Sequence, residues 1–431
     1  GSEMCIRDRA SGWAAIEAEC SPIVGQTPFA LVRTVLNGME AALTASGVQV
    51  EQLDLTAAES AAFEFVARGA DVAAIPAWTS LGPRARNRAI VEVTRKIALH
   101  LSATRPCLYL IEDAQWADEA SAAALDALAV LPQDNRIMIL ATVRAAGLPA
   151  WLQERSAELI ALAPLPHAAA LELLDHLLGD DAQLDSLKTR ILQHTGRSPL
   201  FVEEICRGLV ESGHLVGQWG AFTLKSRDAV LGVPATVQGV IGSRIDRLSL
   251  PEKRMLQAAS AIGPRGSAAL LKSLLAVPEK AFETTIDVLF ETAMLVPVKA
   301  GGPHGQFSFP HELVRQVAYD AILASERSAL HRRIFDLLEA SRGAGAGSDL
   351  EHAGMLVHHA LLSSQWAKAA DHATTIARQS FAQSALADSV RHYDIALQSL
   401  DRLPASPDRE RRAIDLRIEA RGAYSNAGRV Q

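Results

Sequence analysis

Cysteine and aromatic residues are scarce in this sequence, and their scarcity narrows the class of protein. The four cysteines, Cys5, Cys20, Cys107 and Cys206, lie far apart and form no Cys-X-X-Cys pair. This spacing argues against a disulfide framework or a zinc site, so we expect a cytoplasmic protein in a reducing environment. Only 5% of the 431 residues are aromatic, whereas 49% are hydrophobic. Abundant Ala and Leu favour helices, and a chain of this length can form two or more domains.

Long apolar runs and an excess of positive charge are missing as well. No run reaches the roughly 18 apolar residues of a membrane-spanning helix, and no signal peptide is recognisable. The formal net charge is −7. This composition gives no support for a nucleic-acid partner or a membrane-surface partner.

Both ends of the sequence suggest a fragment. The first residue is Gly, and the stretch GSEMCIRDR has no pattern that continues into the following residues. We therefore expect residues 1–12 to be a non-native leader. At the other end, IEARGAYSNAGRVQ stops inside a helical pattern.

Residues 13–163 alternate helical stretches with short apolar runs. The periodicity of TPFALVRTVLNGMEAAL and of RARNRAIVEVTRKIALHLSA predicts two helices, and Pro106 ends the second. The runs WAAIEAEC, CLYLIE and RIMILATV predict strands, and the helical stretch DEASAAALDALAVL separates the last two. Near-continuous apolar strands that alternate with helices are typical of a parallel sheet covered on both faces.

Helices predominate after this region. Residues 164–231 predict a helical lid without strands, and residues 232–341 predict a winged-helix region with a hairpin in AMLVPVKAGGPHGQFSFP. The stretch RGAGAGSD, residues 342–349, has the composition of a flexible linker. Residues 350–431 carry small and aromatic residues at helical spacing, which predicts incomplete tetratricopeptide-like repeats, about one and a half of them.

The stretch CLYLIEDAQWADEAS combines an apolar run with acidic residues. If CLYLIE is a strand of a parallel sheet, Glu112 and Asp113 follow its carboxyl end, where such sheets bind ligands. Carboxylates are hard oxygen ligands for Mg²⁺, and in phosphoryl transfer a second acid can orient the attacking water. The simpler alternative is a loop that caps the next helix, and Asp118 fits the N-cap position of that helix.

The next predicted strand ends in ATVR, which brings Thr142 and Arg144 to the same edge of the sheet. A guanidinium suits a γ-phosphate because it donates two parallel hydrogen bonds, although a surface position is the simpler interpretation for one arginine. The phosphate-loop pattern GxxxxGK[ST] is absent from the sequence, which has no Gly-Lys dipeptide. The amides and lysine of that loop supply most phosphate binding. We therefore expect this chain to bind nucleotide poorly or not at all.

Six stretches in order resemble one family. They are ECSPIVGQTPFALVRTVL, LYLIEDAQWADEAS, RIMILATVRAAG, TGRSPLFVEEICRGLVESG, VPATVQGVIGSRIDRLSLPEKRMLQAASAIG and FSFPHELVRQVAYDAIL. They resemble the AAA-like (origin-recognition-like) ATPase module of multidomain bacterial signal-transduction ATPases with numerous domains, the STAND class. LYLIEDAQWADEAS is similar to its Walker B segment. The implied fold is mainly α with an α/β core: a truncated parallel-sheet P-loop-type ATPase core, a helical lid, a winged-helix region and the start of a TPR-like α-solenoid.

The resemblance implies a role for five residues. Glu112 stands at the magnesium-binding acid, where Asp is common, and Asp113 stands at the adjacent acid that activates water. Arg144 stands at the sensor arginine. Pro199 matches the proline of a Gly-X-Pro signature beside the adenine and ribose. His311 matches a winged-helix histidine that senses a bound diphosphate, for which a structural histidine at a domain interface is the alternative.

The resemblance also implies cofactors and partners. ATP or ADP and Mg²⁺ would bind between the α/β core and the lid of the full-length parent. The family's phosphate loop precedes the segment similar to ECSP, which implies that truncation removed the loop and left this chain inactive. Arg197 stands where the family has Gly, which puts close approach of the backbone to the nucleotide in doubt. A protein partner is expected at the repeats, and nothing marks a basic recognition helix for nucleic acid.

Three kinds of parent stay open. The stretches VPATVQGVIGSRIDRL and HHALLSSQWAKAADHA most resemble modules joined to class III adenylate or guanylate cyclases. A LuxR-type transcriptional regulator, with its DNA-binding domain beyond Gln431, is the first alternative. The second is an interaction scaffold in which only the helical repeats act and ATP is not hydrolysed.

Overall fold

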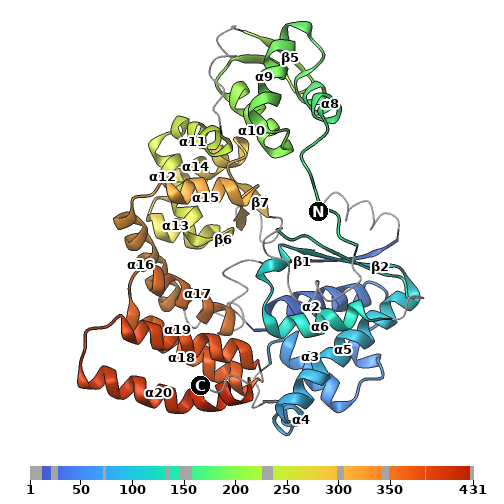
Figure 1. Ribbon diagram of the computed structural model, residues 1–431, viewed down its shortest axis with the longest axis vertical. Coiled ribbons are helices and arrows are strands. Elements are labelled where there is room, and N and C mark those ends of the chain that lie inside the picture. The colour runs from blue at the N-terminus through green and yellow to red at the C-terminus, as the bar shows by residue number, and fades with distance from the viewer. Residues whose placement is uncertain are drawn as a thin grey trace. The chain divides into compact units, whose positions relative to one another are not determined.

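Two units make up the chain in the computed structural model (Figure 1). The first contains residues 1–157 and 338–431, and the second contains residues 158–337. The structure describes residues 12–20, 28–70, 74–131, 135–144, 158–225, 236–298, 305–341, 349–383 and 385–427. Residues 1–11 of the expected leader and residues 342–348 of the expected linker lie outside the described residues.

A three-stranded parallel sheet lies at the centre of the first unit, as the apolar runs predict. Its strands are β1 (Ala14–Glu19), β2 (Cys107–Glu112) and β3 (Ile137–Ala141), in the order β1-β2-β3. Every residue of β2 before Glu112 is buried, which explains why this run carries no polar alternation. The register pairs Glu19 of β1 with Glu112 of β2, so that both strands end at the same level.

Five helices accompany this sheet in the described residues of the chain before β3. They are α2 (Ala30–Thr44), α3 (Ala57–Val66), α4 (Pro76–Thr79), α5 (Pro83–Thr104) and α6 (Glu119–Ala129). Helices α2, α5 and α6 are the ones expected from periodicity. Helix α5 begins at a proline, which needs no hydrogen bond to its nitrogen there, and ends two residues before Pro106.

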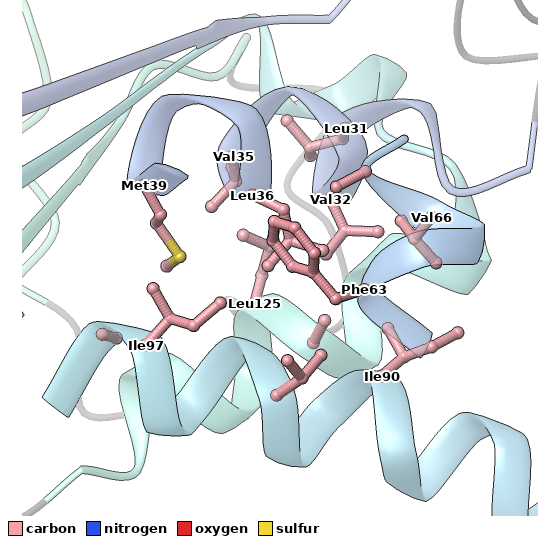
Figure 2. Close-up of a cluster of buried hydrophobic side chains, with 14 of the residues drawn as sticks. Leu31, Val32, Val35, Leu36, Met39, Phe63, Val66, Ile90, Ile97 and Leu125 are labelled. Carbon is pink, nitrogen blue, oxygen red and sulfur yellow. The ribbon is translucent and has the colours of Figure 1, made fainter. Parts of the chain in front are cut away.

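The main hydrophobic core lies between the helices and the sheet. Figure 2 shows side chains of α2, α3, α5 and α6 that meet there, among them Leu36, Met39, Phe63, Ile97 and Leu125. Full burial of one such side chain contributes about 1.5–3 kcal/mol. The opposite face of the sheet carries a small cluster in which no residue of a described helix takes part: Trp13, Ala15, Leu108, Leu110 and Leu140. Leu108 and Leu110 are buried on this face too, which agrees with the expectation that both faces of the sheet are covered.

Four antiparallel helices follow the expected linker. They are α17 (Asp349–Leu362), α18 (Trp366–Ala382), α19 (Leu386–Asp401) and α20 (Pro407–Asn426). Buried alanines such as Ala373, Ala377 and Ala396 allow these helices to approach closely. The four helices form two hairpins, where the sequence predicts about one and a half repeats. Ala385, which precedes α19, belongs to the same hydrophobic core as the helices of the sheet.

His392 of α19 is a buried titratable group in this helical array. Its side chain is fully buried, and its Nδ1 donates a hydrogen bond of 2.8 Å to the carbonyl oxygen of Asp388. Burial, together with the positive charge of the nearby Arg391, lowers the pKa of His392 from 6.5 to about 4. The imidazole is therefore neutral in the folded protein at neutral pH.

Acidification is expected to destabilise the helical array through His392. Because the pKa is lower in the folded state, the stabilisation is complete above pH 6.5 and is lost as the pH falls through about 4. The shift corresponds to about 3 kcal/mol. Replacing His392 with Leu should remove most of this loss, measured by hydrogen exchange of α19 after correction for the intrinsic pH dependence. His100→Leu, at an exposed histidine of α5, is the control. Equal acid sensitivity in both variants would contradict the assignment.

The second unit begins with three helices and a β-hairpin. The helices are α8 (His167–Leu178), α9 (Asp185–Thr195) and α10 (Pro199–Glu211). The hairpin consists of β4 (Leu215–Gln218) and β5 (Ala221–Leu224), within residues for which the sequence predicts helices alone. It packs its buried Leu215 and Phe222 into the same core as the three helices. Each of these strands has four residues and one buried side chain, so the alternation of buried and exposed residues is too short to be recognised in the sequence.

The rest of the second unit contains the expected hairpin and further helices. They are α11 (Val237–Arg247), α12 (Leu250–Ile262), β6 (Arg265–Ser267), α13 (Ala268–Leu275), α14 (Glu279–Glu291), β7 (Val296–Val298), β8 (Gln306–Ser308), α15 (Glu312–Asp320) and α16 (Ala324–Ala340). The antiparallel sheet has the order β6-β8-β7. The expected hairpin is thus confirmed, while its Gly-Gly-Pro turn lies outside the described residues.

Helix α14, which precedes that hairpin, is acidic on its surface. Glu279, Glu283, Asp287 and Glu291 follow one another at four-residue spacing, and all four are exposed. Residues four apart lie on one face of a helix, and a row of carboxylates there repels phosphates. The row of acids favours the prediction that the chain has no nucleic-acid partner, and this stays a prediction. Among the described helices, none combines the length and the apolar character that crossing a membrane requires.

Candidate functional site

The expected magnesium acids lie at the carboxyl end of β2. Glu112 is the last residue of the strand, half-buried, and Asp113 follows it. Side chains alternate along a strand, so Glu112 belongs to the face that carries Leu108 and Leu110. Its neighbour in register, Glu19 at the end of β1, is an acid that the sequence did not single out. The pairing of two parallel strands, which spacing along one strand cannot show, brings these two glutamates together.

Asp113 is held in an unusual backbone conformation. Its φ of 53° and ψ of 44° lie in the left-handed region, which Asp tolerates better than most residues. Its backbone N–H donates a hydrogen bond of 3.0 Å to Oγ1 of Thr142, and the N–H of Ala114 donates one of 2.9 Å to the carbonyl oxygen of Thr142. The loop after β2 is therefore fixed to the end of β3. This confirms that the acids and the ATVR stretch share one edge of the sheet.

Gln115 joins Asp113 to Arg144 within this loop. Its Nε2 donates a hydrogen bond of 2.7 Å to Oδ1 of Asp113, and its Oε1 accepts one of 3.2 Å from the backbone N–H of Arg144. Arg144 itself is exposed, three residues beyond the end of β3. Sequence reasoning missed Gln115, because its partner at position 144 lies 29 residues further along the chain.

Asp118 caps two helices at once. The expected N-cap of α6 is confirmed, since Oδ1 accepts a hydrogen bond of 2.8 Å from the N–H of Ser121. The same carboxylate also accepts from the N–H groups of Phe29 (2.9 Å) and Leu31 (3.2 Å) at the start of α2. Oγ of Ser121 donates to Oδ2 of Asp118 and accepts from the N–H of Val32. Burial raises the pKa of Asp118, and these four hydrogen bonds oppose the rise.

Cys20 lies at the same edge of the sheet but does not provide a nucleophile. It is buried directly after β1, and its N–H donates to the carbonyl oxygen of Glu112 at 2.9 Å. Burial, together with the negative charges of Asp118, Asp113 and Glu19, raises the pKa of the Cys20 thiol to about 12. A thiol with this pKa stays protonated at neutral pH and is unreactive.

The acids at this edge fit the magnesium-binding part of a nucleotide site. The described residues at this edge do not supply a phosphate-binding loop. Magnesium binds proteins through one or two carboxylates together with substrate phosphates, which matches the pair Glu112 and Asp113. No group of three or more potential metal ligands is found among the described residues. A phosphate could use free N–H groups at a helix start. At the start of α2, Asp118 and Ser121 already accept hydrogen bonds from three N–H groups, and Asp118 accepts one from an N–H group in α6.

Pro199 belongs to the second unit and begins α10 directly after the N-cap residue Ser198. The two residues before Ser198, Gly196 and Arg197, both have left-handed backbone conformations, with φ of 54° and 62°. Arg197 thus takes the conformation that glycine adopts without strain. The N–H of Arg197 donates to Oγ1 of Thr195 at 3.2 Å. Arg197 therefore keeps the left-handed backbone before α10 that would suit the Gly expected from the resemblance, and it adds a side chain there.

His311 is the N-cap residue of α15, although its side chain makes no capping hydrogen bond. Like Pro199, it belongs to a different unit from the three residues at the sheet edge. The structure thus brings Glu112, Asp113 and Arg144 together through one loop. The roles of Pro199 and His311 stay predictions.

Comparisons with known proteins give one sequence relative and one structural neighbour of interest. No family model matches the chain. It is 27% identical over 262 residues to an uncharacterized protein of Rhizobium meliloti (strain 1021), covering 59% of this chain and 24% of that protein. The chain thus matches about a quarter of the relative's length.

The structural neighbour is a Signal Transduction ATPase with Numerous Domains (STAND) protein with a tetratricopeptide repeat sensor, from Pyrococcus horikoshii. Its TM-score is 0.42 at 10% sequence identity, with 96% of this chain and 59% of that chain covered. A similarity at this level does not establish a shared function, which must be argued from the residues of the site.

Proposed function

We propose that this chain is part of an ATP-binding regulatory ATPase, a nucleotide-dependent switch in signal transduction. The observation that carries the proposal is the loop after β2. Two adjacent acids stand at the carboxyl edge of a parallel sheet, and the second is fixed to the neighbouring strand through Thr142 and Gln115. Ligands of parallel sheets bind at this edge.

Each of the five predicted site residues has a distinct part in this proposal. Glu112 would hold Mg²⁺, which neutralises developing charge on the phosphates when bound. Asp113 would accept a hydrogen bond from the attacking water and orient it. Arg144 would donate two hydrogen bonds to a γ-phosphate. Pro199 would line the adenine and ribose, and His311 would respond to a bound diphosphate.

In this proposal the phosphate-binding loop would be supplied by residues outside the given sequence. The sequence contains no GxxxxGK[ST] pattern, and Asp118 and Ser121 already use three N–H groups at the start of α2 and one in α6. The relative from Rhizobium meliloti is matched over only 24% of its length, which is compatible with a larger parent. A nucleotide-cyclase-associated parent and a LuxR-type parent are both compatible with this proposal.

A second candidate function is a scaffold that binds a protein through the helical array. It is favoured by α20, on which Ile414 and Ile418 are 55% and 67% exposed. These two residues are four positions apart and form one apolar stripe on the helix surface. In the first proposal the same array would receive the partner whose activity the nucleotide controls.

Restoring the upstream part of the native reading frame is expected to produce binding of MgATP. In the extended protein, Glu112→Ala and Asp113→Ala should each weaken this binding by about 10–100-fold, the cost typical of a damaged metal site. Isothermal titration calorimetry with MgATP and with magnesium-free ATP measures the loss. Glu410→Ala removes an exposed acid of α20 and should leave the affinity unchanged.

Two results would count against this function. Negligible MgATP binding by the extended protein and by both variants would reject an ATPase and favour the scaffold. An upstream sequence without a Gly-Lys-Ser/Thr loop would reject the assignment of the missing phosphate part.

A further inference from the structure

The side-chain amide of Gln115 uses both of its ends inside the loop after β2. The NH₂ group donates to the carboxylate of Asp113, and the carbonyl oxygen accepts from the backbone of Arg144. A carboxylate side chain could only accept here, and an ammonium group could only donate. The chemistry at position 115 therefore needs a group that donates at one end and accepts at the other.

This amide completes the restraint of Asp113. The backbone of Asp113 is already fixed by the hydrogen bond to Thr142 and by its left-handed conformation. The bond from Gln115 adds a restraint on Oδ1 and so sets the orientation of the whole carboxylate plane.

The same amide sets the point at which the chain leaves β3. The carbonyl oxygen of Thr142 accepts a hydrogen bond from the N–H of Ala114 in the loop after β2. Two residues further along the chain, the N–H of Arg144 donates to Gln115 of the same loop. The direction in which the Arg144 side chain starts is therefore tied to the orientation of Asp113. A displacement of either residue has to change the hydrogen bonds of Gln115.

We propose that Gln115 is a positioning residue, which holds the acid Asp113 and the arginine Arg144 toward the same nucleotide phosphate. The role at a nucleotide phosphate rests on the proposed function of the site. The hydrogen bonds of Gln115 are independent of that function. Gln115 does not touch the reacting atoms itself, and it acts through its two neighbours. Loss of one contact should therefore disturb one of the two neighbours selectively.

Three substitutions separate the two contacts of Gln115. Gln115→Glu keeps an acceptor for the N–H of Arg144 and removes the donor to Asp113. Gln115→Lys keeps a donor to Asp113 and removes the acceptor for Arg144. Gln115→Leu removes both contacts at similar size. Gln398→Leu, at an exposed glutamine of α19, is the matched control.

The first measurement is hydrogen exchange at the backbone amide of Arg144 in the chain without nucleotide. We expect exchange to become about tenfold faster in Gln115→Lys and Gln115→Leu, as loss of one hydrogen bond predicts, and to stay unchanged in Gln115→Glu and Gln398→Leu. Circular dichroism verifies that each variant is folded. Equal exchange in all four variants and the unmodified chain would overturn the assignment.

The second measurement uses the upstream-extended protein and nucleotides. Gln115→Lys should reduce the preference for ATP over ADP, because Arg144 is displaced. Gln115→Glu should raise the Mg²⁺ concentration needed for ATP binding, because Asp113 is released, and should keep the preference. If neither effect occurs although ATP binds, Gln115 has no positioning role. If ATP does not bind at all, the proposed function fails, and the exchange at Arg144 still decides whether the amide links the two residues.

Discussion

Replacing Arg244 with Met is expected to lower the free energy of unfolding of the second unit by about 3–5 kcal/mol, the range found when one partner of a buried ion pair is removed. Arg244 lies on α11 and is only 1% exposed. Its guanidinium donates to Glu204 and Glu211 of α10, at 2.6 Å for the closest Glu211 oxygen. It also donates to the carbonyl oxygen of Thr292 at 2.8 Å. The Met variant leaves Glu204, whose side chain is 5% exposed, as a buried charge without its cation.

The physical reason for this large effect is the location of the charge. An arginine inside the protein has lost its hydration, and only the two carboxylates and the carbonyl replace it. Burial lowers the pKa of Arg244, but the hydrogen bonds and charges of Glu211 and Glu204 raise it above its usual value. The group therefore stays charged, and it links α10, α11 and the end of α14. We expect α10, α11 and α14 to lose their protection together when Arg244 is removed.

Hydrogen exchange of peptides from α10, α11 and α14 measures this loss, since a chain of two units does not unfold in a single step. Arg247→Met is a matched control on the same helix. Arg247 also donates to α10, at 2.9 Å to the carbonyl oxygen of Gly208, but it is exposed. Its removal should cost about 1 kcal/mol or less.

A double variant tests the origin of the cost. Arg244→Met together with Glu204→Met removes the unpaired buried charge and should restore much of the stability. An Arg244→Met protein as stable as Arg247→Met would show that the buried ion pairs contribute little.

Replacing Asp118 with Ala is expected to cost the first unit about 3 kcal/mol or more, because three N–H groups lose their acceptor and each such loss costs about 1–3 kcal/mol. Those groups belong to Phe29 and Leu31 at the start of α2 and to Ser121 in α6. The side chain is 2% exposed, so water does not replace the lost acceptor readily. Phe29 is affected most, because it adopts a left-handed backbone conformation with φ of 62° that is costly for a bulky residue.

Urea unfolding and hydrogen exchange of α2 measure the effect of Asp118→Ala. Ser406→Ala is the control: Ser406 caps α20 of the same unit and accepts one exposed hydrogen bond, from the N–H of Arg409. Loss of this ordinary cap should cost about 1 kcal/mol. Equal losses in the two variants would show that the contacts of Asp118 with α2 are unimportant. Faster hydrogen exchange in α6 alone, with the exchange of α2 unchanged, would also show that the contacts of Asp118 with α2 are unimportant.

The elements of this protein that local chemistry specifies were predictable from the sequence. The apolar run CLYLIE predicted β2, and Asp118 before an alanine-rich helix predicted the cap of α6. Both depend on residues within a few positions of one another. The acids Glu112 and Asp113 were found in the same way, because a strand followed by carboxylates is a local pattern. Their chemical role stays a prediction.

The features that needed the tertiary structure join residues far apart in the chain. Asp118 reaches α2 across 89 residues, Gln115 reaches Arg144 across 29, and Arg244 reaches Glu204 across 40. Many aspartates, glutamines and arginines occur in the sequence, and spacing does not show which pairs meet. The sequence by itself therefore determined a parallel sheet with two acids at the end of one of its strands. The tertiary structure decided which side chains bond to Asp113, because packing alone brings the ends of separate strands and helices together.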